Sequence, residues 1–341
     1  MRSQPQSGEA NPGTPAPEQT LRGRAATFVK AAVSAALLFF LVRRVNRDEL
    51  GAMLRQTDPR WVLLSVAVGV MTIAISSWKW RILLRAKGKP VPFGQLFNLY
   101  FTGLFINNFF PSTIGGDIFR GYEVGRDVDD RALAMASVFM ERFTGMTALT
   151  AIALVAFVSN LSGFRDPRFA LALGAGLLVY IAVTLAVLLP GPLAWGLRRF
   201  PDGMSGRLIG KLIRVQSAVH DYAGLTRAIV KALALSVLFH LTAMVYIYVS
   251  SRAFGVALPA RTLLVIVPVI MFISSLPITI GGLGLFEWAF FFTFGASGAG
   301  GSPGLLVGLL MRGNSLLFSL WGGIIYAVKG VGKRTGRNPQ R

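Results

Sequence analysis

The chain has 341 residues, of which 53% are hydrophobic and only 15% charged, a balance outside the range of ordinary soluble domains. It contains no cysteine, which excludes disulfides, thiolate catalysis and cysteine metal sites. The formal net charge is +20, but basic residues accumulate in the cytoplasmic loops of membrane proteins, where anionic lipids attract them. We therefore expect a membrane protein with no nucleic-acid partner.

The first 24 residues are rich in Pro, Gln, Gly and Ser. Such a segment buries too little apolar surface to fold, and it is predicted to be a disordered cytoplasmic tail. The apolar runs that follow are about as long as a membrane-crossing helix and are continuous rather than alternating, which favours helices over a β-barrel. The sequence therefore predicts an all-α polytopic membrane protein. Full spans are expected at residues 26–42, 61–78, 132–158, 169–189, 228–249 and 304–328.

Two further apolar segments, 93–110 and 262–276, each run into a Pro and Gly break that a continuous helix tolerates poorly. They are predicted to form hairpins, re-entrant or crossing, so that the chain has about six to eight transmembrane segments. If the first hairpin enters from inside and the second from outside, four basic loops lie together in the cytoplasm. Residues 43–60 then lie outside although they carry five arginines, and we expect an interfacial amphipathic helix there.

An internal repeat is the most informative feature of the sequence. Residues 105–116 read FINNFFPSTIGG and residues 272–282 read FISSLPITIGG, so the pattern P-x-T-I-G-G occurs at Pro111 and again at Pro277. The spacing, 277 minus 111, is 166 residues, about half the chain. Three full spans separate the copies, and this odd number predicts two inverted halves, about 25–160 and 165–330.

Breaks at matching positions of two halves are the sequence signal of a transport site, because irregular backbone at membrane depth is tolerated where protein or water satisfies it. The alternative, that both breaks merely turn the chain, stays open. The residues predicted to form the breaks are Pro111, Gly115, Gly116, Pro277, Gly281, Gly282 and Gly284.

Charged residues near the breaks are the candidates for binding. Glu141 and Arg142 lie about ten residues into their span, where each charge costs about 2.5–3.5 kcal/mol to insert. Two interpretations of this pair stay open. The residues form either a site for a headgroup or for proton coupling, or an ion pair that locks helices together. Asp117 and Arg120 follow the first glycine pair and Glu287 follows the second; helix N-termini at these places would favour an anion such as phosphate.

Further polar residues are candidates for either binding or packing. Asn107 and Asn108 precede the first break and suit either substrate hydroxyls or backbone carbonyls freed by the break. Arg312 and Asn314 lie in the last span, roughly matching the charged pair of the first half, while His240 suits proton relay or simple packing. The chain has just two histidines, separate in the sequence, which disfavours a metal site. The sequence contains no P-loop, G-x-S-x-G or HExxH motif, so we expect no catalytic residue, metal or cofactor.

The segments NNFFPSTIGGDIFRGYEV (107–124), ASVFMERFTG (136–145) and PITIGGLGLFEWAF (277–290) resemble the flippase-like family named after the transmembrane domain of lysylphosphatidylglycerol synthase. The resemblance extends from about residue 25 to about residue 330, as one transmembrane domain. In this family the membrane half of the multiple peptide resistance factor moves aminoacylated phosphatidylglycerol, and other relatives are linked to hopanoid, polyprenol or glycosyltransferase functions. The first motif is matched by Asn107, Asn108, Gly115, Gly116, Asp117 and Arg120, the charged helix by Glu141 and Arg142, and the second break by Gly281, Gly282, Gly284 and Glu287.

The resemblance implies a flippase or translocator for an anionic phospholipid, aminoacyl-phosphatidylglycerol, polyprenyl phosphate or hopanoid-type lipid in the bacterial inner membrane. The basic loops predict that both termini are cytoplasmic. After residue 328 a short basic tail, 331–341, stands where the synthase has its aminoacyl-transferring domain, so we expect no enzyme activity. One alternative is an accessory protein that presents a lipid-linked substrate to a separate glycosyltransferase or synthase. Another is an enzyme acting on lipid phosphate, which the absence of paired carboxylates disfavours. The predicted substrate-binding residues are Asn107, Asn108, Asp117, Arg120, Glu141, Arg142, Glu287 and Arg312.

Overall fold

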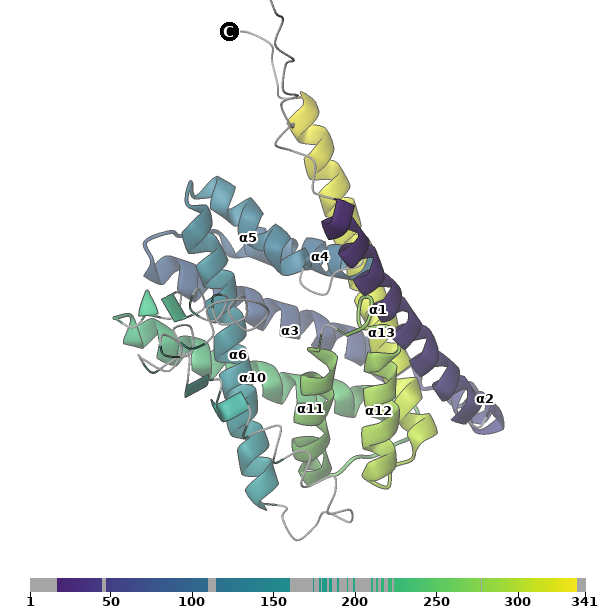
Figure 1. Cartoon of the computed structure of the whole chain (residues 1–341). Helices are drawn as coiled ribbons and strands as arrows, with labels where there is room; N and C mark the ends of the chain where they lie inside the picture. Colours follow the sequence, from purple (N-terminus) through teal and green to yellow (C-terminus); the bar gives the residue numbers. More distant parts are fainter. Residues whose placement is uncertain are drawn as a thin grey trace, which may run out of the picture.

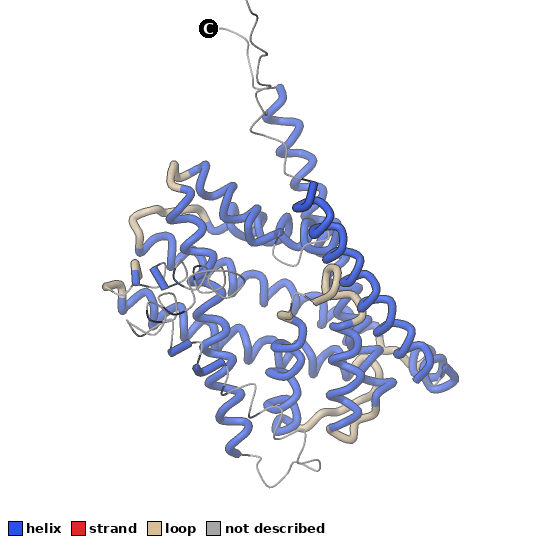
Figure 2. Tube along the Cα trace, viewed as in Figure 1, coloured by secondary structure: helices blue, strands red, loops and turns tan. Residues whose placement is uncertain are grey.

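A computed structural model describes residues 17–44, 47–109, 115–159, 224–276 and 278–335, together with separate positions between 174 and 222. All regular structure in these residues is helical, and they contain no strand (Figure 2). The prediction of an all-α protein is therefore confirmed. The helices are α1 (Pro17–Arg44), α2 (Arg47–Arg55), α3 (Pro59–Ala86), α4 (Phe93–Phe109), α5 (Gly115–Asp127), α6 (Arg131–Ser159), α10 (Thr226–Arg252), α11 (Ala260–Ser274), α12 (Leu285–Ala296) and α13 (Gly301–Thr335).

Four of these helices, α3, α6, α10 and α13, are long and apolar enough to cross a membrane. They contain the predicted spans 61–78, 132–158, 228–249 and 304–328. The predicted span 26–42 lies within α1, which also takes in residues 17–24 of the predicted tail, and most of 169–189 lies outside the described residues. Between α1 and α3, the arginine-rich segment contains the short helix α2, where an interfacial helix was predicted.

Helix α3 shows how the sequence sets its own boundaries. The side chain of Asp58 caps the helix by accepting the N–H of Arg60 at 2.9 Å, and Pro59 occupies the first turn, where its missing N–H costs nothing. The helix ends before Gly88, whose φ of +73° is a left-handed conformation that glycine adopts readily. It therefore continues past the predicted span 61–78, and Lys79 lies inside the helix.

The two breaks separate the arms of two helical hairpins, α4 with α5 and α11 with α12 (Figure 1). In the first, Gln95 at the start of α4 bonds to Asp127 at the end of α5, at 2.6 Å, so the arms run antiparallel. Near the tip, a Cβ added to Gly116 would lie 2.2 Å from the carbonyl oxygen of Gly103, so this approach requires glycine. Pro111 and Pro277 lie outside the described residues.

The two halves of the fold repeat the same four-helix unit, α3–α6 and α10–α13. The first helices of the two units begin at residues 59 and 226, which are 167 residues apart. Their last helices begin at residues 131 and 301, which are 170 residues apart. Contacts repeat as well: α4 packs on α13 just as α11 packs on α6. The equivalent helices α3 and α10 are antiparallel, since Asp58 bonds to Ala253 and Lys79 to Ser236. The halves are therefore inverted, as the P-x-T-I-G-G repeat predicts.

Close packing of α4 on α13 depends on Gly322, where a Cβ would lie 2.0 Å from the carbonyl oxygen of Phe101. We expect Gly322→Ala to destabilise the protein by about 1–3 kcal/mol, because backbone on both sides leaves no room for the methyl group. Gly313 of the same helix has no atom within 4 Å of its Cβ position, so Gly313→Ala is the matched control. Thermal unfolding in detergent checks both variants, and equal midpoints for them would contradict this account of the interface.

Candidate functional site

Five charged side chains from α3, α5 and α6 form one connected cluster in the first half of the fold. They are Lys79 of α3, Asp117 and Arg120 of α5, and Glu141 and Arg142 of α6. The structure thus brings four predicted binding residues together and adds Lys79. Three are cations and two are anions, so the cluster is close to neutral without being fully balanced. We call these five residues the charge cluster.

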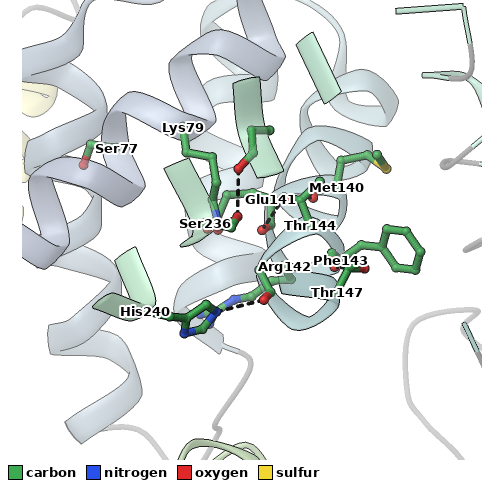
Figure 3. A network of polar contacts seen from close by, with 12 residues as sticks. Ser77, Lys79, Met140, Glu141, Arg142, Phe143, Thr144, Thr147, Ser236 and His240 are labelled. Carbon is green, nitrogen blue, oxygen red and sulfur yellow. Dashed lines mark hydrogen bonds and ion pairs between the residues drawn. The ribbon is translucent and has the colours of Figure 1, made fainter. Parts of the chain in front are cut away.

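Glu141 is the buried anion of the charge cluster. Its Oε1 lies 3.0 Å from Nζ of Lys79, and both side chains are buried. Lys79 also donates to the hydroxyl of Ser236 on α10 at 3.2 Å, and Figure 3 shows the three side chains converging where α3, α6 and α10 meet. Glu141 thus has its partner on another helix, α3, and the pairing offsets the cost of burying both charges.

Asp117 joins the two arginines of the charge cluster. Its carboxylate accepts Nη2 of Arg120 at 2.6 Å, and it accepts Nε and Nη2 of Arg142, each at 2.9 Å, in a bidentate contact. Bidentate pairs of this kind hold a fixed geometry. Asp117 is also the third residue of α5, where the free N–H groups of the first turn favour negative charge.

Arg120 is held by aromatic rings as well as by carboxylates. Its guanidinium carbon lies 3.9 Å from the ring centre of Tyr100 and 5.0 Å from that of Trp80, contacts that stabilise a cation. Its Nη2 also lies 3.5 Å from Oε2 of Glu141. The side chain is 2% exposed, yet Nη1 finds no hydrogen-bond partner among the described residues.

The second half contains a matching ion pair between Glu287 of α12 and Arg312 of α13, with Nε donating to Oε1 at 2.8 Å. Glu287 is the third residue of α12, as Asp117 is of α5, and its other oxygen accepts the N–H of Gly284 at 2.8 Å. In each half the arginine follows its carboxylate by 25 residues. The predicted correspondence between the charged residues of the two halves is thus an equivalence of whole ion pairs.

Arg142 and Arg312 differ in their hydrogen-bond partners and in the exposed fraction of their side chains. Arg312 donates Nη1 and Nη2 to the carbonyl oxygens of Gly281 and Gly282, at 3.2 and 3.0 Å, and its side chain is 15% exposed. The side chain of Arg142 is 56% exposed. Arg312 therefore satisfies carbonyls freed by the second break, whereas Arg142 presents donors to its surroundings. Phe290, fully buried, stands 170 residues after Arg120, so the second half has an apolar side chain at the matching position.

The asparagines before the first break connect the two breaks. Asn107 accepts the N–H of Gly116 at 2.8 Å through its side chain. A Cβ added to Gly281 would lie 3.4 Å from the backbone oxygen of Asn107, so the second break lies against the end of α4. Asn108 donates to the hydroxyl of Ser315 on α13 at 3.0 Å. These contacts join residues that the sequence places in opposite halves.

Two other predicted candidates pack within the fold. His240 lies 2.9 Å from the carbonyl oxygen of Gly145 through Nε2. Asn314 donates to the hydroxyls of Ser65 at 2.9 Å and Tyr246 at 3.0 Å. Neither forms an ion pair with another described residue, and each ties α10 or α13 to another helix. Among the described residues there is no group of three or more His, Cys, Asp or Glu suited to a metal ion.

Comparison with known proteins identifies the family. A family model described as the lysylphosphatidylglycerol synthase TM region matches residues 27–323. The chain belongs to this family. A UPF0104 membrane protein of Methanothermobacter thermautotrophicus is 25% identical over 90% of this chain and 94% of its own length. A second from that organism is 24% identical over 70% of this chain and 76% of its own length. A UPF0104 membrane protein of Methanocaldococcus jannaschii is 29% identical over 32% of this chain but covers just 33% of that relative.

Proposed function

We propose that this member of the family is a lipid translocator that moves an anionic headgroup across the bacterial inner membrane. The acyl or isoprenoid chains stay in the bilayer while the headgroup crosses. The observation that carries the proposal is the repeated ion pair, Asp117–Arg142 and Glu287–Arg312, of two inverted halves. In each pair the carboxylate lies in the first turn of α5 or α12 and the arginine lies inside the following helix, α6 or α13. In secondary transporters, substrate sites form where broken helices of inverted repeats meet.

Arg142 is the residue best suited to take the headgroup first. Its contacts to Asp117 use two of its five N–H groups, and 56% of the side chain is exposed. A guanidinium binds phosphate oxygens through parallel hydrogen bonds, which a lysine cannot reproduce. The first turn of α5 supports negative charge at the same place.

Alternating access follows from the inversion of the halves. In this conformation the first ion pair is exposed through Arg142, while Arg312 is shielded and bonded to backbone carbonyls. Rocking one half against the other exchanges these environments and carries a bound headgroup past the end of α4. Both termini are cytoplasmic in this scheme, because it groups the basic loops on that side. An accessory protein that presents a lipid to a separate glycosyltransferase or synthase would need no such exchange.

Headgroup translocation in proteoliposomes tests the proposal. We expect the purified protein to move fluorescent anionic lipids between leaflets, and Arg142→Gln to slow this by at least about tenfold, since it removes charge-assisted bonds worth roughly 1.5–3 kcal/mol. The matched control is Arg131→Gln, an exposed arginine at the start of the same helix that stacks on Tyr122. If the protein moves neither anionic phospholipids nor polyprenyl phosphates, the accessory role is favoured instead.

A further inference from the structure

His240 lies where the two halves of the fold meet. It belongs to α10 of the second half, and its Nε2 lies 2.9 Å from the carbonyl oxygen of Gly145 on α6 of the first half. The side chain is 3% exposed, inside a helix long and apolar enough to cross a membrane. A titratable side chain at such a depth is costly, and histidines of this kind form proton relays in pumps and transporters. Because His240 spans the boundary, rocking of the halves changes its surroundings.

One ring nitrogen of His240 is available to bind a proton. A carbonyl oxygen only accepts, so Nε2 carries the N–H, and the lone pair of the neutral ring lies on Nδ1. Nδ1 is buried and has no hydrogen-bond partner among the described residues. Histidine is the side chain whose charge changes most readily near neutral pH. The ring therefore presents a basic nitrogen that its packing contact leaves unused.

His240 is a neighbour of the charge cluster. Gly145, whose carbonyl accepts from the ring, follows Glu141 by about one helical turn, and a Cβ added to Gly145 would lie 3.4 Å from Nζ of Lys79. Ser236, which accepts from the same Nζ at 3.2 Å, precedes His240 by about one turn of α10. Figure 3 shows His240 and Lys79 in one network of polar contacts. The charge on His240 and the charges of the cluster therefore act on each other.

Positive charge dominates the surroundings of His240. The cluster on α3, α5 and α6 has three cations and two anions, and within it Lys79 is paired with Glu141. The other helices packed on α10 are α11 and α13. The charged residues in their described apolar segments are Arg261, exposed at the start of α11, and Arg312, which is paired with Glu287. An anionic headgroup at the cluster offsets the excess of positive charge, and it thereby favours a proton on His240.

We infer that His240 takes up one proton when an anionic headgroup binds at the charge cluster, and that proton and headgroup cross the membrane together. The inference rests on the proposed function and adds its driving force. The proton enters from the side on which the headgroup binds, is held on Nδ1, and leaves with the headgroup on the other side. By linkage, each of the two ligands strengthens the binding of the other by the same factor.

The first half has no second proton site at the matching position. Ile73 of α3 stands 240 minus 73, or 167, residues before His240, which is the spacing between the starts of the equivalent helices α3 and α10. An isoleucine side chain binds no proton. We therefore expect one proton for each headgroup, so that cotransport of a headgroup with a single negative charge moves no net charge.

NMR of the histidine rings in detergent tests the linkage, because the chain has just two histidines. His220 is exposed, with Nδ1 2.9 Å from the carbonyl oxygen of Gln216, and serves as the internal control. We expect phosphatidylglycerol to raise the pH at which His240 is half protonated by at least about one pH unit, a tenfold change in proton affinity, relative to phosphatidylcholine. His220 should show no such difference, and Arg142→Gln should remove it at His240.

Translocation in proteoliposomes tests the coupling. With the inner solution about one pH unit above the outer one, fluorescent phosphatidylglycerol should accumulate in the inner leaflet by up to about tenfold, because each entering proton carries one headgroup. His240→Gln keeps a donor for the carbonyl of Gly145 but binds no proton, so the two leaflets should fill equally. His220→Gln is the matched control and should behave as the native chain.

The two measurements separate this inference from the proposed function. If the native protein moves lipid but fills both leaflets equally under the gradient, or if His240→Gln still accumulates it, the coupling is wrong and translocation stands. If no lipid moves while phosphatidylglycerol still changes the protonation of His240, the proton site is supported and translocation fails. If His240 titrates identically with both lipids, the inference is wrong whatever the transport result.

Discussion

Replacing Glu141 with glutamine is expected to destabilise the protein by about 3–5 kcal/mol, the usual cost of removing one partner from a buried ion pair. The loss leaves Lys79 buried against a neutral amide and removes one of the two carboxylates of Arg120. Hydrophobic replacement of both partners behaves differently, because no charge is then left unpaired. We therefore expect the double variant Lys79→Met with Glu141→Met to be more stable than Glu141→Gln alone.

Thermal unfolding in detergent measures these variants, and the single variants Lys79→Met and Glu141→Met complete a double-mutant cycle for the pair. The matched control is Glu123→Gln, since Glu123 pairs with Arg126 at 3.1 Å on the partly exposed side of α5, where such pairs contribute about 0–1 kcal/mol. If Glu141→Gln unfolds no earlier than Glu123→Gln, then Glu141 is not an ionised partner of Lys79. The charge cluster would then contain three cations and one anion.

Much of the architecture could be predicted because membrane helices leave a strong local signal. Four predicted spans correspond to α3, α6, α10 and α13, and the repeat at Pro111 and Pro277 is enough to predict inverted halves. The hydrophobic length of a span and the helix-breaking effect of Pro and Gly both act within a few residues. These features need no knowledge of the tertiary fold.

The site was harder to predict, because its partners come from different helices. Lys79 lies just outside the predicted span, which ends at Trp78, whereas α3 continues to Ala86. Its flanking tryptophans, and its place in an otherwise apolar segment, are the signals that could have found it. Tyr100 and Ser236 are common residues of membrane helices, and their contacts with the charge cluster arise from packing alone.

Arg312 illustrates the opposite case, in which the sequence pointed to the right residue but left its role open. Its chemistry and its position in the second half suggest a headgroup ligand as readily as they do for Arg142. The structure shows its nitrogens bonded to Glu287 and to the carbonyls of Gly281 and Gly282. Those carbonyls are freed by the break, and glycine offers no side chain to satisfy them. We therefore expect Arg312 to position the second break rather than to bind the headgroup in this conformation.

Cross-linking the two breaks is expected to stop translocation. A Cβ added to Gly281 would lie 3.4 Å from the backbone oxygen of Asn107, so the two positions are close across the two halves. Alternating access requires these halves to rock against each other. The chain has no native cysteine, so Asn107→Cys with Gly281→Cys supplies the sole thiol pair. We expect oxidation to a disulfide to reduce headgroup translocation by at least about tenfold, and reduction to restore it.

A second cysteine pair separates the effect of motion from that of cross-linking itself. Gln95 and Asp127 meet at the other end of the α4–α5 hairpin, within one half of the repeat. Nε2 of Gln95 donates to Oδ2 of Asp127 at 2.6 Å. A disulfide between Gln95→Cys and Asp127→Cys ties two arms that move together, so translocation should continue. If both disulfides stop transport equally, the hairpin itself must flex. If neither does, the breaks do not separate, and the headgroup crosses by a path that avoids the end of α4.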